Sequence, residues 1–320
     1  MQLALMIEGQ NGIDWPRWQR IAATAEELGF VGLYRSDHYT NAIPPEIDSL
    51  ELWTSLTWLA THSKTLRFGP IVAPVTFRHP AMNARVALQI DALSGGRLSL
   101  GLGAGWQQRE HHMFGLDLLD LRSRFDRFSE ALEITARLVR GDAPVTFEGH
   151  YYQLRDAVLK PRAHWPRRPD GPTTTMPIVV GGNGERRTLS LAARWADEWN
   201  AVMIPPHRFK ALNEMLDARL ADLGRSPRSV RRSIMQGLRY GCDDAAFDNA
   251  LAARAAMWGA PATRNELRER GEIAGVGAEV IDQIAAYEDA GVECIMLQWL
   301  DVDDLDGLHH FADTAARWLR

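Results

Sequence analysis

Residues 176–203 read MPIVVGGNGERRTLSLAARWADEWNAVM, and this stretch decides the fold class. It opens with a short β-branched apolar run at 177–180, which is typical of a buried strand. Gly181-Gly182-Asn183-Gly184 follow as a turn with almost no side chains, and 185–192 has helical spacing. Backbone N–H groups and a helix dipole would then point at one place, which suits a phosphate. The alternative is an ordinary strand-to-helix turn in which glycine only supplies a positive φ.

The same alternation of strand and helix runs through the chain in both directions. Strands are predicted at 3–8, 31–36, 66–72, 98–103, 178–181, 199–203, 233–240 and 294–299. Helices are predicted at 15–28, 50–62, 81–93, 123–139, 185–196, 208–223, 245–258 and 278–290. Eight strands alternating with eight helices predict an α/β fold, a (β/α)8 TIM barrel forming one domain over residues 1–320. An open doubly wound sheet is the lesser alternative.

Two segments interrupt the alternation. Residues 141–176 combine a hairpin-like pattern around Phe147 and Tyr151 with several prolines and arginines. Residues 259–277 contain Pro261 and a charged run, which predicts one short solvated helix. We interpret both segments as insertions at the barrel rim.

Composition limits the function classes. The chain has 320 residues, of which 46% are hydrophobic and 24% charged, with a net charge of −5 and no basic block. These values are ordinary for a soluble globular protein and argue against nucleic acid or a membrane as the main partner. Cys242 and Cys294 fit neither a metal nor a redox spacing, and no signal-like or membrane-spanning run occurs, so we expect a cytoplasmic protein.

In a TIM barrel the chemistry lies at the carboxyl ends of the strands. The second strand ends in Ser36-Asp37-His38-Tyr39, where Asp37 and His38 can supply hydrogen bonds, a proton or metal ligands. An Asp cap beside a half-exposed structural His is the alternative. No other predicted strand end offers metal ligands, so no metal site is expected.

The third and fourth strands have unusual ends. Pro70-Ile71-Val72-Ala73-Pro74 carries a proline on each side, which predicts a bulge or bend because proline donates no ladder hydrogen bond. Gly101-Leu102-Gly103-Ala104-Gly105-Trp106 would let a flat group approach the backbone, with Trp106 as a wall. A close helix–strand contact explains these glycines equally well.

Taken together, these motifs resemble the bacterial luciferase-like monooxygenase family. The resemblance rests on 36–39 and 101–106, on Phe77-Arg78-His79-Pro80-Ala81 and the run 91–98, on 147–152, and on 181–185 with 196–200. More narrowly, the chain resembles the branch that uses the deazaflavin coenzyme F420. The resemblance implies a TIM barrel with an insertion, a flavin-type ring at the strand carboxyl ends and a homodimer.

The resemblance also assigns residues. Asp37 and His38 match the acidic residue and histidine that contact the ring near its reactive centre, so both are the candidate catalytic residues. The ring and ribityl contacts match the third and fourth strand ends, and the phosphate turn matches the glycines of the fifth. The full candidate cofactor set is Asp37, His38, Pro70, Ile71, Val72, Gly105, Trp106, Gly181, Gly182, Asn183, Gly184 and Val202.

The function that follows is an F420-dependent oxidoreductase that transfers a hydride between the deazaflavin and an organic, apolar substrate. His38 would supply a proton or polarise the substrate, and Asp37 would orient His38 or bond the ring. Relatives that oxidise sugar phosphates carry a catalytic Glu where this chain has Trp106, which argues against that substrate class. Alternatives are a two-component FMN monooxygenase that receives reduced flavin from a separate reductase, and a non-catalytic flavin-binding relative. The partners expected besides the substrate are a second copy of the chain and a separate flavin or F420 reductase.

Overall fold

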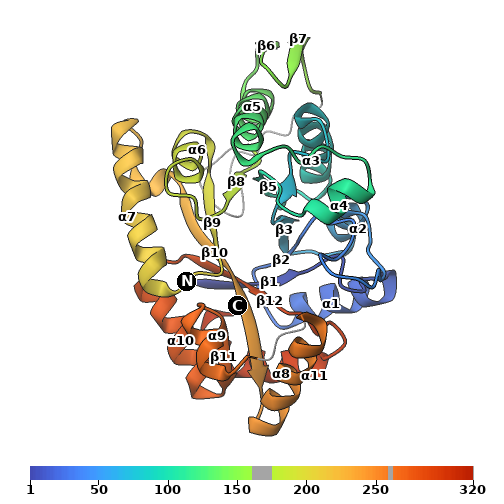
Figure 1. Ribbon diagram of the computed structural model, residues 1–320, viewed down its shortest axis with the longest axis vertical. Helices are drawn as coiled ribbons and strands as arrows, with labels where there is room; N and C mark the ends of the chain where they lie inside the picture. Colours follow the sequence, from blue (N-terminus) through green and yellow to red (C-terminus); the bar gives the residue numbers. More distant parts are fainter. Residues whose placement is uncertain (161–174, 259–261, 320) are drawn as a thin grey trace.

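The computed structural model describes residues 1–160, 175–258 and 262–319. Its core is one parallel sheet in the order β3-β2-β1-β12-β10-β9-β8-β5-β4. β3 (Arg67–Pro70) and β4 (Ala73–Pro74) are two halves of one strand of the barrel. β4 pairs with β5, and a bridge from Phe68 to Leu98 also joins β3 to the chain just before β5. The sheet therefore closes on itself, and the predicted TIM barrel is confirmed, with helices arranged around it (Figure 1).

The predicted elements are present with shifted ends. The remaining barrel strands are β1 (Gln2–Ile7), β2 (Gly32–Arg35), β5 (Leu100–Gly103), β8 (Ile178–Gly181), β9 (Glu198–Val202), β10 (Arg231–Gly241) and β12 (Cys294–Gln298). The predicted helices are α1 (Trp15–Glu27), α2 (Leu52–His62), α3 (Pro80–Leu93), α5 (Leu121–Arg140), α6 (Thr188–Trp195), α7 (Pro206–Asp222), α8 (Asp244–Trp258) and α10 (Ala278–Asp289). The hydrophobic periodicity thus identified every one of these strands and helices.

Three elements were not predicted, and one helix begins later than expected. α4 (Gln108–Met113) and α11 (Leu305–Thr314) follow β5 and β12, and β11 (Ile273–Val276) lies in the second insertion. β11 pairs in parallel with the part of β10 that continues beyond the barrel. The predicted helix at 185–196 starts at Thr188, because 185–187 form a turn and Arg187 provides no side-chain cap.

The two insertions otherwise follow the prediction. In the first, β6 (Val145–Glu148) and β7 (Gln153–Ala157) form an antiparallel hairpin that projects beyond α5 (Figure 1). The proline-rich part, with Arg162, Arg167 and Arg168, lies outside the described residues. In the second, α9 (Arg264–Glu269) is the predicted short helix, and it begins with a capping box between Thr263 and Glu266.

Successive residues of a barrel strand face opposite sides of the wall. On β12, Met296 belongs to the buried cluster inside the barrel, whereas Ile295 and Leu297 belong to the outer core under the helices. On β10, Met235 faces inward and Ile234 outward in the same way. None of the described helices combines the length and the apolar character needed to cross a membrane, and Cys242 and Cys294 are free thiols.

A single carboxylate joins the end of α1 to the loop before β3. Glu26 Oε1 accepts hydrogen bonds from the backbone N–H groups of Lys64 and Thr65, at 2.8 and 2.6 Å, and from the Thr65 hydroxyl at 2.9 Å. Burial raises the pKa of Glu26, but these bonds outweigh it, and the pKa lies below its ordinary value.

We therefore predict that Glu26→Gln lowers the free energy of unfolding by about 1 kcal/mol at pH 7, because the amide is a weaker acceptor. A carboxylate with a depressed pKa stabilises the fold above its unfolded pKa, and this stabilisation is lost as the pH falls through the folded pKa. Urea unfolding from pH 7 to pH 3 should thus show the two proteins converging in acid. Glu27→Gln, on the exposed neighbouring residue, is the control and should change nothing. A pH-independent difference would contradict the prediction.

Candidate functional site

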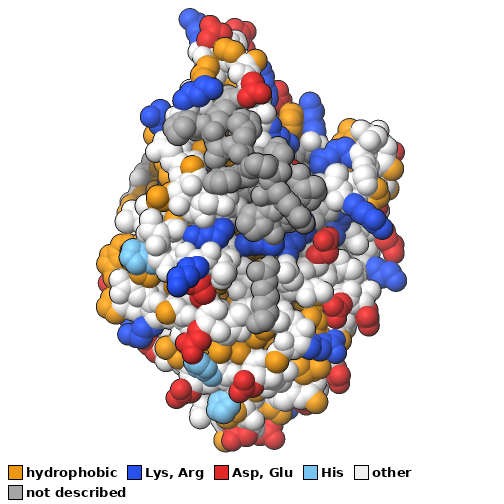
Figure 2. All heavy atoms as spheres, turned by 180° about the vertical axis from the view of Figure 1, so that it is seen from behind, with side chains coloured by type: hydrophobic (Ala, Val, Ile, Leu, Met, Phe, Trp, Pro, Cys, Tyr) orange, Lys and Arg blue, Asp and Glu red, His pale blue; other side chains and the backbone are white. Residues whose placement is uncertain are grey.

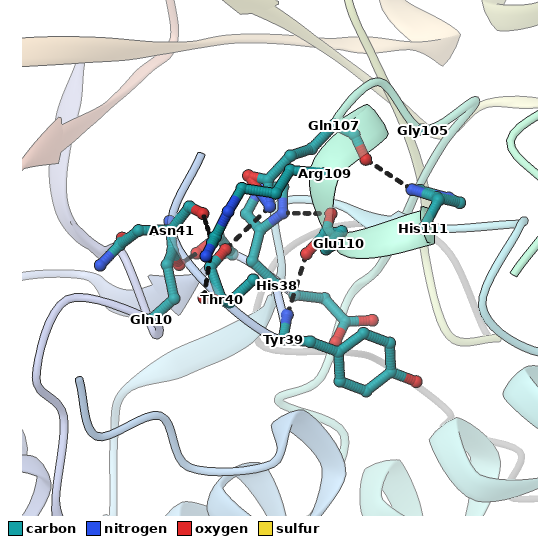
Figure 3. Close-up of polar contacts among 12 residues, drawn as sticks. Gln10, His38, Tyr39, Thr40, Asn41, Gly105, Gln107, Arg109, Glu110 and His111 are labelled. Carbon is teal, nitrogen blue, oxygen red and sulfur yellow. Dashed lines mark hydrogen bonds and ion pairs between the residues drawn. The ribbon is translucent and has the colours of Figure 1, made fainter. Parts of the chain in front are cut away.

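His38 lies at the carboxyl end of β2 and is held by a buried glutamate. Its Nδ1 lies 2.8 Å from Glu110 Oε1, and the side chain of Glu110 is only 1% exposed (Figure 3). The other carboxylate oxygen of Glu110 accepts a hydrogen bond from the backbone N–H of Tyr39 at 3.0 Å. Glu110 therefore fixes both the ring and the backbone beside it, and Nε2 of His38 has no partner among the described residues.

The protonation of His38 follows from this contact. Burial lowers the pKa of His38, but the hydrogen bond and the charge of Glu110, with a further contribution from Glu8, raise it above the ordinary value. The imidazolium form of His38 therefore persists to a higher pH than in an isolated histidine. The protonated ring can donate a proton from Nε2 while its Nδ1–H stays hydrogen-bonded to Glu110.

Asp37 is bound to an arginine and does not orient His38. The sequence had left open an orienting role for Asp37. Arg78 Nη1 lies 2.5 Å from Asp37 Oδ2, and Arg78 Nη2 lies 3.0 Å from Glu51 Oε1. Burial raises the pKa of Asp37, and the charge of Arg78 opposes this rise. The orienting carboxylate comes instead from α4, an element that the periodicity of the sequence did not predict.

Trp106 forms the exposed wall beside His38. Its side chain is 63% exposed, and its ring meets the His38 ring edge-on, with centroids 5.7 Å apart. Gly105 has φ +85°, and a Cβ there would lie 2.9 Å from Thr76 Oγ1, so a glycine is needed to place Trp106 at the rim. His38 therefore forms a polar wall of the site, and Trp106 forms an apolar wall beside it.

The third strand bends where proline predicted an irregularity. The peptide bond between Ile71 and Val72 is cis. The Val72 side chain packs against two glycines: a Cβ would lie 2.4 Å from it at Gly103 and 2.7 Å from it at Gly181. Gly181 thus makes room for Val72. Gly101 of β5 makes room for the Pro70 carbonyl oxygen in the same way.

The floor between these walls is apolar. Inside the barrel a buried cluster includes Met6, Ile71, Val179, Met235 and Met296. Val72 and Val202 pack against it from the mouth side. A flat apolar or aromatic group can therefore rest on this floor without leaving a buried polar group unpaired.

The glycine turn after β8 is tied to β9 by side chains. The Asn183 amide donates to Val202 O at 2.7 Å and accepts from Val202 N at 2.9 Å, and the Trp199 indole donates to Gly182 O at 2.9 Å. Gly182 has φ +123°, a conformation that favours glycine. The backbone N–H groups of Gly184 and of residue 185 donate to no acceptor in the described part of the chain. The turn can therefore offer backbone donors to an anion, whereas Asn183 and Val202 are already bonded to each other.

One cation beside this turn remains available. Arg187 donates to Asp126 and Arg208 pairs with Glu185, whereas exposed Arg186 has no side-chain partner in the described ranges. On the face seen in Figure 2, Lys and Arg side chains gather along the border of the residues drawn in grey. Exposed Arg186 therefore leaves a positive charge beside the turn, which favours an anionic ligand.

Sequence reasoning missed two carboxylates of the site. Glu110 carried no signal, because nothing in its own segment shows that it meets His38 across the barrel. Glu8 directly follows β1 and could have been recognised as a strand end; its oxygens accept from Gln298 Nε2 at 2.6 Å and Gln10 Nε2 at 2.9 Å. The described residues contain no group of three His, Cys, Asp or Glu side chains arranged for a metal ion.

The sequence matches the luciferase-like monooxygenase family over residues 1–275. The chain belongs to this family. It is 30% identical over 204 residues to 4-hydroxyprotoasukamycin monooxygenase of Streptomyces nodosus subsp. asukaensis, covering 64% of this chain and 52% of that protein. It is 34% identical over 177 residues to the F420-dependent glucose-6-phosphate dehydrogenase of Microbacterium testaceum, covering 54% and 48%. The chain thus spans about half the length of these curated relatives.

Solved structures share the luciferase-like fold over the full length. An F420-dependent secondary alcohol dehydrogenase, in complex with an F420-acetone adduct, superposes with a TM-score of 0.81 at 19% identity, covering 100% of this chain and 99% of that one. At this identity the likeness establishes the barrel alone.

We predict that Glu110→Gln lowers the pKa of His38, because the amide keeps an acceptor for Nδ1 but removes the charge. A histidine with a raised pKa stabilises the fold below its unfolded pKa, and this contribution is lost as the pH rises through the folded pKa. NMR titration of the His38 ring should show the change. Asp117→Asn, in the exposed loop after α4, is the charge-matched control. An unaltered His38 titration in Glu110→Gln would contradict the proposed role of Glu110.

Proposed function

We propose that this chain is an F420-dependent oxidoreductase that transfers a hydride between the deazaflavin and an organic, apolar substrate. The observation that carries the proposal is the His38–Glu110 pair beside exposed Trp106, over an apolar floor that ends at the glycine turn. Relatives named as F420-dependent dehydrogenases support this cofactor.

The residues present fit such a cofactor. The ring would lie on Val72 and its apolar neighbours, and Gly105 would leave room for its edge. The phosphate would accept from the free N–H groups at and after Gly184, with Gly182 keeping the turn open. When bound, the deazaflavin supplies two-electron hydride chemistry and no oxygen activation.

The chain's own residues then bind, orient and move a proton. Glu110 orients the His38 ring. Nε2 would take a proton from a substrate hydroxyl as the hydride leaves the substrate, or give a proton to a substrate oxygen as the hydride arrives. Asp37, paired with Arg78, keeps the β2 loop in place and would hydrogen-bond the edge of the ring. Trp106 holds an apolar substrate against the ring and shields it from water.

The substrate class follows from the walls of the site. Trp106 and the apolar floor favour an apolar or aromatic alcohol, aldehyde or enone over a sugar phosphate. The glutamate expected for sugar-phosphate relatives is replaced by Trp106, although Glu110 places a carboxylate one helical turn further on. We infer in addition that the enzyme acts as a cytoplasmic homodimer, as the family resemblance implies.

The second candidate is an FMN-dependent monooxygenase that receives reduced flavin from a separate reductase. It is favoured by the relative named 4-hydroxyprotoasukamycin monooxygenase. The glycine turn does not distinguish the cofactors, because both carry a tricyclic ring, a ribityl chain and a first phosphate. A non-catalytic flavin-binding protein is the third candidate.

If His38 moves the proton, His38→Ala should lower turnover by about a hundredfold while cofactor affinity stays within a few-fold. The assay follows deazaflavin absorbance with the best substrate from a panel of apolar alcohols, aldehydes and enones. His62→Ala, on exposed α2, is the control and should retain full turnover. Normal turnover in His38→Ala would make His38 a structural residue.

The cofactor is tested by titrating the purified protein with each candidate. We expect tighter binding of the deazaflavin than of FMN, because its lactyl-oligoglutamate tail adds carboxylates near Arg186. The preference should shrink as salt rises, because exposed charges are screened. Tighter FMN binding with oxygen-dependent product formation would transfer the protein to the monooxygenase alternative.

The same titration locates the phosphate. Gly182→Val should weaken deazaflavin binding at least about tenfold, because a side chain there disturbs the turn. Gly95→Val also replaces a glycine of positive φ, but in open space before β5, and serves as the matched control. Equal affinity of the two folded variants would separate the phosphate from this turn.

A further inference from the structure

A second cavity lies outside the barrel mouth, between the far end of β10, the start of α8 and the segment that joins β12 to α11. Its volume is about 610 Å³, within the range of small-molecule sites. In Figure 1 these elements lie at the end of the molecule opposite the β6–β7 hairpin. The apolar part of its lining is Leu238, Tyr240, Ala246, Ala250, Trp299 and Leu300.

The alternation of side chains separates this cavity from the barrel interior. Tyr240 and Trp299 belong to the outer core, on the opposite side of the wall from Met235 and Met296. The Tyr240 ring also packs edge-on against Phe311 of α11, with centroids 5.5 Å apart. The cavity is therefore a site between the barrel wall and its helices.

A buried donor in the cavity lining lacks an acceptor. Trp299 is 5% exposed, and its indole N–H has no hydrogen-bond partner within the described residues. A buried donor left unpaired costs about 1–3 kcal/mol. This N–H is closed to solvent, so Trp299 contributes apolar surface to the lining and not a donor.

The open side of the cavity is negatively charged. Asp301 and Asp306 have no cationic partner in the described ranges, whereas neighbouring Asp303 is paired with Arg17 and Arg20. The Arg239 guanidinium, which also lines the cavity, lies 3.2 Å from the Glu272 carboxylate, so its charge is matched. Asp304, which caps α11, also lines the cavity without a cationic partner among the described residues, so the lining carries a net negative potential over an apolar cavity.

We propose that this cavity binds a small organic cation, with an ammonium group at Asp301 and Asp306 and an apolar or aromatic body against Tyr240 and Trp299. The apolar lining gives the site its affinity for the body, and the carboxylates select the charge. The site is separate from the proposed cofactor site and does not depend on its function.

Three probes of one skeleton test the charge: 2-(4-methoxyphenyl)ethylamine, 2-(4-methoxyphenyl)ethanol and 4-methoxyphenylacetate. Calorimetry at pH 7 and low salt should show the amine binding at least about tenfold tighter than the alcohol, with the carboxylate weakest. Asp301→Asn with Asp306→Asn should remove most of this preference. Asp313→Asn, exposed on the same α11, should leave it intact. Equal affinity for the three probes would overturn the proposal.

Cavity-filling variants test the location. Ala250→Trp should abolish amine binding, Ala246→Leu should weaken it, and Trp299→Ala should weaken it by removing an aromatic wall. Melting curves confirm that each variant is folded, and the two alanine positions provide independent evidence if one variant unfolds. Amine binding that survives both substitutions, or that is lost in Trp106→Ala, would place the probe elsewhere and overturn the proposal.

Discussion

The close approach of the third strand to β5 is the constraint on which the rest of the structure depends. A Cβ at Gly69 would lie 2.0 Å from Ser99 O, and one at Gly101 would lie 2.1 Å from Pro70 O. No side chain can be accommodated at such distances from a backbone carbonyl. The barrel closes here only because glycine occupies both positions, and the same closure places Val72 in the floor of the site.

Two carboxylates near the end of β2 have different tasks because they have different partners. Glu110 is buried against a histidine, whose charge it favours, whereas Asp37 is buried against the permanent charge of Arg78. Removing either partner would leave a buried charge unpaired, which is costly. The result is one titratable pair that can move a proton and one ion pair that holds the loop, side by side at the mouth.

The arrangement separates binding from chemistry. The apolar floor and Trp106 provide contact area that does not fix the orientation of a ligand. His38 and the glycine turn would fix that orientation with a few polar groups. A site of this kind can accept different apolar substrates by changes at its walls while the floor stays the same. This is consistent with a family whose members are named both as dehydrogenases and as monooxygenases.

Local pattern was sufficient for the barrel, because each strand and helix buries one face and its period is visible in the sequence. The glycine turn, the bend at Ile71 and His38 were recognised for the same reason: each is a property of a few consecutive residues. The partner of His38 was not, since Glu110 stands 72 residues away and meets it only when the barrel closes. β11 and the outer cavity likewise depend on how far β10 extends past the wall. The sequence by itself therefore determined the strands and helices and nominated the candidate site residues. Only the tertiary structure decided which charges face each other, because such contacts join segments whose separation no local period encodes.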